Sequence, residues 1–528
     1  MNNGVAINKK AKRKLKIIFF FIEVCCPIFK RSKVGITYYC TLLIIVAKNK
    51  KILIIGAGPA GLSAAYKLAE AGAEVEVFEA GPHVGGLARS FDLWGQRVDC
   101  GPHRFFSQDK IVNDFFKEVV KDDYVMVNRL TRIYYNNRFF YYPLKVFNVL
   151  SNLNLYTVAH ILLSYFHQRI NPIKNPKTFE EWVVNKFGHK LFSIFFKNYS
   201  EKLWGIPCSK IDADWAAQRI KKLSLWEAVK GALVGDKSQK HKTLVDQFAF
   251  PKRGTGTIYE KMAAYIESKG GKVHRNTPVK RIIRDENGKA AGIELAGPSP
   301  LEEGFRERAG DVVVSTMPLT LMVKGLANVS SDVQFACDQL YYRNTILVYL
   351  EIDAINLFPD NWIYVHSPEV KHGRITNFRN WSPDLCGDKN TTILCLEYWC
   401  FENDGIWKAD DKHLSDIASE EIRKIKLLPA ETKILNTFVM KLPRCYPVYE
   451  TGYGKHLSVI QEYVNSIPDL LAIGRYGAFK YNNQDHSILM GLLAAREILT
   501  GKNQNLWSIN TDSEYQEKAE VLETGLDR

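Results

Sequence analysis

The chain has 528 residues, more than one hydrophobic core usually contains, so its length predicts at least two domains. Hydrophobic residues make up 46% of the sequence and charged residues 24%, a composition typical of folded proteins. The ten cysteines form no CxxC pair and no Cys/His cluster at zinc-ligand spacing. The sequence therefore predicts no bound metal, and its thiols are typical of a reduced, cytoplasmic protein.

The net charge of +14 is concentrated near the N-terminus. The first 51 residues contain twelve Lys or Arg and one acid, Glu23, so they carry +11 and the rest of the chain carries 14 − 11 = +3. A nucleic-acid-binding protein would spread its basic residues over a folded face. The distribution of charge therefore argues against nucleic acid as a partner.

Residues 1–49 alternate basic runs with two apolar stretches, 17–29 and 34–47. Neither stretch reaches the roughly 18 uninterrupted apolar residues that a membrane-spanning helix needs. Two interpretations remain open. The segment is an extension outside the fold of a cytoplasmic protein, or residues 1–47 make a weak contact with the surface of the cytoplasmic membrane.

A βαβ pattern follows this segment. Residues 51–55 form a continuous apolar run typical of a strand buried on both faces. Residues 62–71 have the apolar spacing of a helix, and residues 74–78 predict a second strand. These three segments predict a unit of about 30 residues in which the helix crosses between two parallel strands.

The turn of this unit carries the motif Gly56-x-Gly58-x-x-Gly61. The first glycine allows a tight turn, the second lets backbone approach a pyrophosphate, and the third lets the helix pack closely on the strand. The helix N-terminus then offers free N–H groups to the phosphates. Glu79, at the end of the second strand, can accept hydrogen bonds from ribose hydroxyls. The motif therefore predicts dinucleotide binding.

The rest of the chain changes character twice. Aromatic-rich helical patterns predominate from about residue 139 to residue 244. Short strands then return, and a helix ends the pattern at 487–499. The expected strands after residue 272 are 273–274, 279–283, 291–295, 311–316, 345–351, 392–399 and 470–474.

Four further motifs resemble those of UDP-galactopyranose mutases and the wider superfamily of FAD-dependent amine oxidases and protoporphyrinogen oxidases. Residues 80–89 (AGPHVGGLAR) are similar to the glycine-pair extension near the flavin, and residues 99–107 (DCGPHRFFS) to the loop beside the isoalloxazine. Residues 198–205 (NYSEKLWG) resemble a uridine-binding helix, and residues 474–487 (GRYGAFKYNNQDHS) a C-terminal flavin segment. The resemblance covers most of residues 50–502 and implies FAD as the cofactor.

The resemblance, together with the strand pattern, predicts an α/β fold. A discontinuous Rossmann-like FAD-binding domain is expected at 50–135, 246–318 and 468–502. The expected insertions are a helical substrate region at 136–245 and an antiparallel-sheet substrate domain at 319–467. Residues 503–528 are expected to form a C-terminal tail.

The motifs also imply the residues of the site. His103 and Arg475 are the catalytic candidates, His103 through contact with the flavin and Arg475 through a bidentate grip on a diphosphate. The expected cofactor contacts are Gly56, Gly58, Pro59, Ala60, Gly61, Glu79, Ala80, Gly86, Leu87, Arg89, His103, Val279, Gly474, Asn483, Asp485, His486 and Ser487. The expected substrate contacts are Tyr199, Ser200, Trp204, Arg343, Tyr446, Tyr449, Arg475 and Tyr481.

By this resemblance the chain is a sugar-nucleotide mutase in which reduced flavin N5 attacks the anomeric carbon of a UDP-hexose, with NAD(P)H or another external reductant as partner. The alternative is an FAD-dependent oxidoreductase of the amine oxidase, protoporphyrinogen oxidase or carotenoid desaturase type. Phe106 departs from the bacterial mutase pattern, which has a second histidine there, and a diphosphate-clamping arginine has no clean match near Arg219. These departures leave the substrate open.

Overall fold

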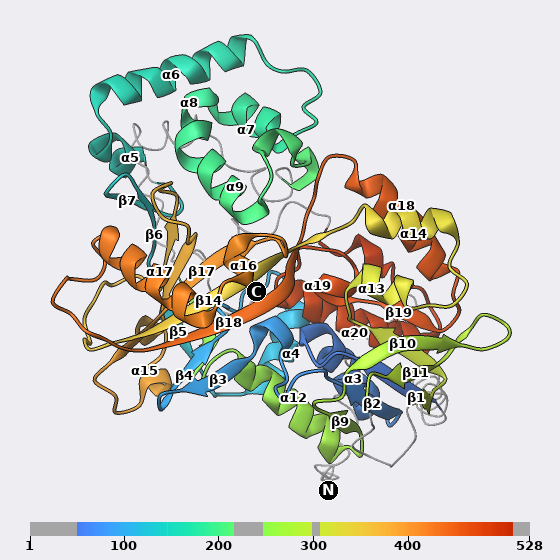
Figure 1. Cartoon of the computed structure of the whole chain (residues 1–528). Coiled ribbons are helices and arrows are strands. Elements are labelled where there is room, and N and C mark those ends of the chain that lie inside the picture. The colour runs from blue at the N-terminus through green and yellow to red at the C-terminus, as the bar shows by residue number, and fades with distance from the viewer. Residues whose placement is uncertain (1–49, 145, 216–246, 298–306, 511–528) are drawn as a thin grey trace, which may run out of the picture.

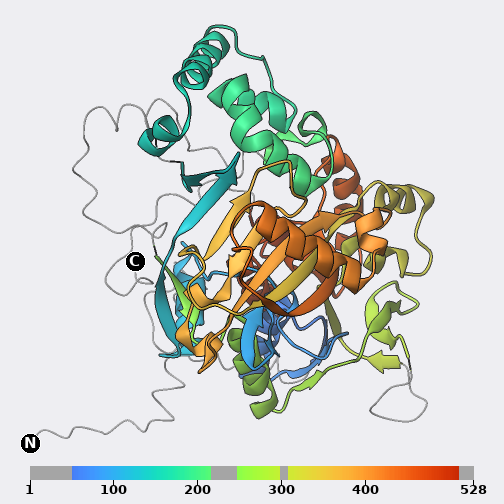
Figure 2. The same cartoon turned by 60° about the vertical axis from the view of Figure 1, so that its left-hand side comes forward.

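The computed structural model describes residues 50–144, 146–215, 247–297 and 307–510. Figures 1 and 2 show three regions: a parallel sheet with helices at the base, a broad second sheet above it, and a helical cap at the far end. The predictions for residues 1–49 and 511–528, and for residues 216–246 of the helical region, lie outside the described residues.

The basal sheet has five parallel strands in the order β19-β13-β1-β2-β9. β1 is apolar at every position after Lys51, whereas β2 alternates glutamate with valine before Phe78. Both strands are buried at every position but the first, as expected of parallel strands covered by helices. The sheet gathers strands from distant parts of the chain, so this region is discontinuous. Its strands are β1 (Lys51–Ile55), β2 (Glu74–Phe78), β9 (Lys272–His274), β13 (Val312–Ser315) and β19 (Leu470–Ala472).

Helices cover this sheet and complete its core. α3 (Pro59–Glu70) and α20 (Gln484–Thr500) pack so closely that a Cβ on Gly491 would lie 2.3 Å from the Ala60 carbonyl oxygen. α12 (Gly256–Ser268) and α4 (Lys110–Val120) contribute further buried apolar side chains to the same core. The close contact between α3 and α20 brings both helix N-termini to the same edge of the sheet.

The second sheet has seven strands in the order β18-β14-β17-β16-β15-β6-β7. All neighbouring pairs are antiparallel except β15 and β6, which are parallel. Its strands are β6 (Thr131–Tyr135), β7 (Arg138–Tyr141), β14 (Tyr342–Ile352), β15 (Trp362–Val365), β16 (Arg374–Asn377), β17 (Thr392–Cys400) and β18 (Ile434–Pro447).

The helical cap lies at the outer end of this sheet, at the top of Figure 1. Its apolar side chains pack against one another and against the sheet. Its elements are α5 (Val146–Asn152), α6 (Leu155–Ile170), α7 (Phe179–Phe187), α8 (His189–Phe192), a π-helical turn (Ser193–Lys197) and α9 (Asn198–Trp204).

The remaining elements connect these three regions. The strands are β3 (Ser90–Leu93), β4 (Gln96–Asp99), β5 (Tyr124–Asn128), β8 (Gln247–Pro251), β10 (Val279–Arg284), β11 (Ala290–Leu295) and β12 (Glu307–Ala309). The helices are α13 (Leu319–Lys324), α14 (Ser331–Asp338), α15 (Pro383–Cys386), α16 (Gly405–Lys408), α17 (Asp411–Lys424), α18 (Tyr453–Asn465) and α19 (Gly474–Gly477), with 3₁₀ turns at Gly86–Ala88, Cys208–Lys210, Phe378–Asn380 and Leu506–Ser508.

The mixed α/β architecture agrees with the predicted fold class, and each strand predicted from the pattern is present within a few residues. One boundary differs. β6 was expected in the FAD-binding domain but belongs to the seven-stranded sheet, because it pairs in parallel with β15, some 230 residues later. Within the described ranges, no helix is long and apolar enough to cross a membrane and no cluster of His, Cys, Asp or Glu could hold a metal ion.

Candidate functional site

A cavity of about 1130 Å³ lies between the carboxyl edge of the parallel sheet and the seven-stranded sheet. Its walls come from the glycine turn after β1, the end of β2, the 99–106 loop, the helical cap and the first turn of α20. Ligands of open α/β sheets bind at this edge, outside the carboxyl ends of parallel strands. The cavity is therefore the candidate site.

The glycine turn has two residues that the fold itself requires. Gly56 has φ +96°, and a Cβ there would lie 2.1 Å from Thr316 Oγ1. A Cβ on Gly61 would lie 2.1 Å from the Gly56 carbonyl oxygen. Both positions therefore accept only glycine, one for its backbone conformation and its contact with Thr316 and the other for helix-on-strand packing.

Gly58 differs from its two neighbours in the motif. Its φ of −80° suits any residue, and the nearest atom to a Cβ there would be Gly86 Cα at 3.9 Å. Within the described part of the chain no side chain caps the first turn of α3, so its N–H groups remain available to phosphate oxygens. The fold does not fill the space beside Gly58, which is the cradle a pyrophosphate requires.

Glu79 lies where the fingerprint predicts a ribose-binding acid. Its Oε2 accepts a hydrogen bond from the Ala57 backbone N–H at 2.9 Å, and its Oε1 accepts one from the Gly81 N–H at 2.9 Å. These two bonds hold the carboxylate at the cavity wall, beside the glycine turn. The remaining lone pairs of a carboxylate can accept from vicinal hydroxyls.

A second glycine pair lies opposite the first motif. Gly85 and Gly86 both have positive φ, +103° and +56°, and a Cβ on Gly86 would lie 3.2 Å from Gly58 Cα. Arg89 closes this turn by donating from Nη1 to the Gly86 carbonyl oxygen at 2.8 Å. The two glycine turns together form a cleft whose walls are backbone.

A buried polar network holds the 99–106 loop against the cavity. Ser90 donates to the Asp99 carboxylate, which also accepts from the Thr255 backbone N–H at 3.2 Å. Thr255 Oγ1 in turn donates to the His103 carbonyl oxygen at 2.6 Å. Burial raises the pKa of Asp99 to about 6. The loop carrying His103 is thereby tied to β3, β4 and the start of α12.

An arginine–carboxylate pair forms part of the opposite wall. Arg374 Nε and Nη2 donate to the two oxygens of Glu397, at 2.5 and 2.6 Å, and the Glu397 side chain is buried. Burial and the nearby charges of Arg374 and Arg475 lower the pKa of His103 to about 3. His103 is therefore a neutral imidazole near pH 7.

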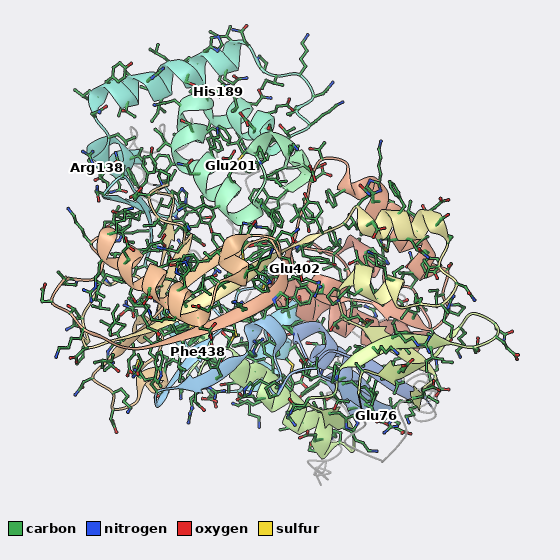
Figure 3. The ribbon with its side chains drawn as sticks, viewed as in Figure 1. Glu76, Arg138, His189, Glu201, Glu402 and Phe438 are labelled. Carbon is green, nitrogen blue, oxygen red and sulfur yellow. The ribbon has the colours of Figure 1, made fainter. Side chains whose placement is uncertain are left out.

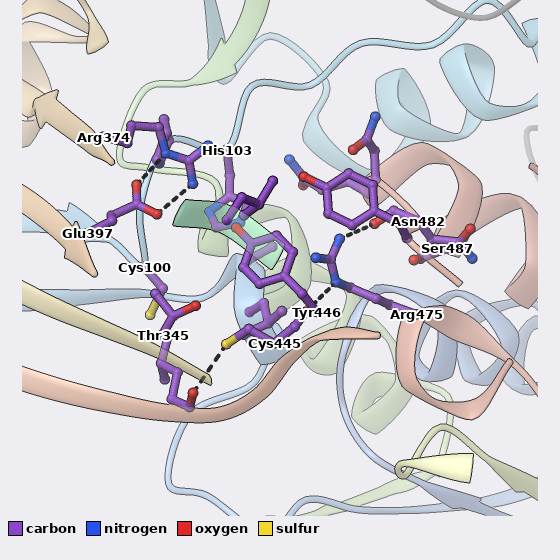
Figure 4. A pocket seen from close by; sticks show the side chains of 18 of the residues that line it. Cys100, His103, Thr345, Arg374, Glu397, Cys445, Tyr446, Arg475, Asn482 and Ser487 are labelled. Atoms are coloured by element: carbon purple, nitrogen blue, oxygen red, sulfur yellow. Dashed lines mark hydrogen bonds and ion pairs between the residues drawn. The ribbon is translucent and has the colours of Figure 1, made fainter. Parts of the chain in front are cut away.

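Arg475 lies across the cavity from this pair (Figure 4). Its Nε donates to the Cys445 carbonyl oxygen and its Nη1 to the Asn482 carbonyl oxygen, both at 2.8 Å. Its guanidinium carbon lies 4.8 Å from the ring centroid of Tyr446 and 4.4 Å from that of Tyr481. The two rings stack on each other at 5.5 Å, so the guanidinium is held rigidly in an aromatic, partly buried setting.

The N-terminus of α20 also reaches the cavity. Asn483 and His486 form a capping box, in which the Asn483 backbone N–H donates to His486 Nδ1 at 3.1 Å. Gln484 accepts a hydrogen bond from the Tyr259 hydroxyl at 2.7 Å and donates to the Arg104 carbonyl oxygen at 3.2 Å. The positive end of this helix therefore faces the site, where it favours negative charge on a ligand.

Most of the residues predicted from the sequence line this one cavity. Those on the wall are Gly56, Gly58, Pro59, Ala60, Glu79, Ala80, Gly86, Leu87, Arg89, His103, Tyr199, Ser200, Val279, Tyr446, Gly474, Arg475, Tyr481, Asn483, Asp485 and Ser487. Gly61 and His486 are not among the described lining residues, because they support the turn and the helix from behind.

Three residues that were expected to contact the substrate do not line the cavity. They are Trp204, Tyr449 and Arg343. Trp204 is fully buried and stacks on Tyr449 at 5.8 Å, while the Tyr449 hydroxyl accepts from the Tyr481 backbone N–H. Arg343 donates to the carbonyl oxygens of Lys202, Leu203 and Trp399. These side chains hold α9 against the sheet, so their contacts are structural.

No sequence motif indicated the Arg374–Glu397 pair. Glu397 is a carboxylate within the apolar run of β17, and such a residue in a buried strand is a signal that it has a charged partner. The partner could not be inferred, because it depends on the register of β16 against β17. Other lining residues that were missed are Arg104, Arg129, Tyr364, His366, Lys441 and Arg444.

Fold and cavity together define a dinucleotide-binding protein of the flavoprotein class. Residues 59–499 match the family model of the flavin-containing amine oxidoreductases, so the chain belongs to that family. Its cofactor is FAD, which fits the backbone cleft beside Gly58 and the fixed carboxylate of Glu79. The predicted superfamily and cofactor are confirmed.

The relatives include both predicted branches. The fold is similar to a crystal structure of reduced UDP-galactopyranose mutase, with a TM-score of 0.76 and 23% identity over 88% of this chain and 99% of that one. The sequence is 30% identical to "Probable UDP-galactopyranose mutase" from Klebsiella pneumoniae over 31% of this chain and 44% of that protein. It is 21% identical to coproporphyrinogen III oxidase from Staphylococcus aureus over 85% of this chain and 99% of that protein.

Proposed function

We propose that the chain is a sugar-nucleotide mutase that acts on a UDP-hexose with FAD in its reduced state. The observation that carries this proposal is the net charge of the whole cavity wall. Seven basic side chains line it against three carboxylates, Glu79, Glu397 and Asp485. The seven are Arg89, Arg104, Arg129, Arg374, Lys441, Arg444 and Arg475.

This excess of positive charge suits an anionic substrate in addition to the FAD pyrophosphate. It opposes a cationic amine, which would meet the arginines without a compensating carboxylate. Glu397 is already paired with Arg374, and Glu79 accepts hydrogen bonds at the ribose end of the cradle. A diphosphate would offer oxygens to both Arg374 and Arg475.

The named side chains have separate roles in this proposal. Arg475 orients the diphosphate, because its Nε and Nη1 are fixed by backbone carbonyls. Tyr446 beside it, and Tyr199 elsewhere on the cavity wall, give flat faces for the base and sugar. His103, neutral near pH 7, can donate or accept a hydrogen bond at the flavin without adding charge.

Reduced FAD, when bound, supplies the nucleophilic nitrogen for exchange at the anomeric carbon. The protein then has to hold the sugar close to that nitrogen and keep the released diphosphate in place. NAD(P)H or another external reductant would be needed only to reduce the cofactor, because the reaction itself is redox-neutral.

The experiment is a titration of the purified protein with UDP and UDP-galactopyranose, before and after reduction with dithionite. We expect binding of UDP, and conversion of the UDP-sugar only by the reduced protein, without oxygen or NAD(P)H consumed in proportion to product. Absence of UDP binding at millimolar ligand, together with flavin reduction by another substrate, would reject the mutase.

One observation favours a second candidate, an oxidoreductase for an apolar or amphiphilic substrate. The cavity extends into the helical cap, where Val158, Ile161, Phe187 and Leu191 line it. A hexose does not need such an apolar arm, whereas a porphyrinogen, which combines an apolar ring with carboxylates, would use both the arm and the arginines. Flavin reduction by anaerobic coproporphyrinogen separates this candidate from the mutase.

A further inference from the structure

Helix α6 exposes a continuous apolar face. Leu155, Leu163, Phe166 and Ile170 are 88%, 67%, 52% and 77% exposed. With Ala159 and Leu162 they recur at helical spacing and form a stripe about 100° wide, the width that a globular protein usually buries. The described side chains of the cap cover only the other side of the helix, where Ile161, Tyr165 and Gln168 are buried.

This exposure is concentrated in one place. Of the fifteen exposed large hydrophobic side chains in the described part of the chain, nine lie between Tyr141 and Ile173. Scattered exposed leucines need no explanation, but a contiguous apolar patch marks an interaction surface.

The location of α6 leaves this face accessible. Figures 1 and 2 show the helix as the outermost element of the cap, with its long side directed away from both sheets. In Figure 3 the labelled His189 lies directly beneath α6, and Arg138, the first residue of β7, lies below it. Both side chains are exposed and lie at the same end of the molecule as α6.

Along the sequence, the charged side chains on and beside α6 have one sign. Residues 124–179 contain seven Lys or Arg and no Asp or Glu. Arg169, Lys174 and Lys177, at the end of α6 and just after it, are exposed. The next carboxylates are Glu180 and Glu181, and Glu181 is engaged in capping α7. The apolar stripe is therefore bordered by positive charge.

We propose that this face, the α6 surface (Leu155, Leu163, Phe166, Ile170, Arg169 and Lys174), binds an anionic lipid bilayer. The apolar side chains enter the interfacial layer with the helix parallel to the membrane, and the basic side chains contact lipid phosphates. A second copy of the chain is disfavoured, because a two-fold contact would bring two positive surfaces together.

The α6 surface adjoins the candidate site. Leu162 and Tyr142 line the cavity and are each 41% exposed. The cavity wall therefore reaches the solvent at the edge of the apolar stripe. A bilayer bound to α6 therefore lies next to the apolar arm of the cavity, whichever substrate the site takes.

The test is flotation of the full-length, FAD-loaded protein with phosphatidylcholine vesicles, with and without phosphatidylglycerol. We expect binding to the vesicles that contain phosphatidylglycerol. Leu163→Ser with Phe166→Ser should lower the partition coefficient roughly tenfold or more, because both side chains lose their apolar insertion. Phe335→Ser on α14 is the matched control, since Phe335 is 59% exposed on another surface.

A second pair of variants tests the charges. Arg169→Gln with Lys174→Gln should reduce the preference for anionic vesicles and the sensitivity of binding to salt. The proposal is overturned if the wild-type protein does not float. It is also overturned if the Leu163/Phe166 variant floats as well as the wild type, because residues 1–47 or another surface would then carry the binding. A different result would point to a second copy of the chain in place of the bilayer. In that case light scattering would show that the wild-type protein is a dimer and the Leu163/Phe166 variant a monomer, and neither would bind vesicles.

Discussion

Single residues of the glycine turn have different tasks. Gly56 and Gly61 fit against other atoms of the protein, whereas Gly58 faces space that the protein leaves open. This distinction separates residues needed for folding from a residue needed only for the cofactor.

We expect Gly58→Val to fold but to contain no FAD, because its side chain would occupy the pyrophosphate position, while its Cβ would make only an ordinary contact with Gly86 Cα at 3.9 Å. The visible absorbance of the bound flavin measures the occupancy, and circular dichroism measures the fold. Gly405→Ala, at an open position of α16, is the control and should remain yellow. Gly56→Ala should instead impair folding. Full flavin occupancy in Gly58→Val would contradict the assignment of this turn.

Arg475 is the residue on which the proposed substrate depends most. Loss of a charge-assisted bidentate contact costs about 1.5–3 kcal/mol, so Arg475→Ala should weaken UDP binding roughly 10- to 150-fold while FAD remains bound. Isothermal titration with UDP is the measurement. Arg275→Ala removes an exposed arginine paired with Glu267 and should have no effect. An unchanged affinity in Arg475→Ala would exclude the proposed diphosphate grip.

At the scale of elements, the site depends on three segments that meet at the cavity. The Ser90–Asp99–Thr255 network fixes the His103 loop, and Gln484 connects α20 to Tyr259 and to the Arg104 carbonyl. The capping box of α20 therefore matters for the orientation of a helix whose N-terminus faces the flavin site.

His486→Ala should remove half of this capping box and lower the free energy of unfolding by about 0.5–2 kcal/mol. The first turn of α20 would fray, so FAD affinity should also fall. Denaturant unfolding of the apoprotein and flavin titration measure the two effects. His413→Ala is the control, because His413 occupies the same third position of α17, where Asp410 caps its backbone N–H. Equal stability of both variants would show that the cap contributes nothing.

At the scale of the whole molecule, neutral buried histidines make the fold sensitive to acid. Burial and the charge of Lys202 lower the pKa of His366 to about 3, and His103 and His372 are lowered as well, first by burial. A lowered histidine pKa contributes stability that is present above the unfolded pKa of about 6.5 and is lost as the pH falls toward 3.

We therefore expect the free energy of unfolding to decrease between pH 6.5 and pH 4. Each such histidine contributes a slope of about 1.4 kcal/mol per pH unit, so His366→Gln should reduce the slope by about that amount. Its baseline stability should also fall, because His366 stacks on Tyr199 at 4.7 Å. Denaturant midpoints measured across this range provide the test. His413→Gln, which changes an exposed histidine, should leave the slope unaltered.

The sequence by itself determined the parts of the site whose physics is local. The turn after β1 needs particular glycines at particular positions, and the acid must follow the second strand, so these residues are readable in a window of about 30 residues. The alternation of strand and helix patterns likewise predicted the α/β fold class, the strands of the parallel sheet, and β14 and β17 of the second sheet.

Only the tertiary structure decided which distant side chains share the cavity. Arg374 meets Glu397 through the register of two strands, and β6 pairs with β15 across 230 residues of sequence. Trp204 and Arg343 are drawn into the packing of α9 against the sheet instead of the cavity wall. The direction of a side chain depends on the segments that pack around its backbone, and no local pattern in the sequence records that packing.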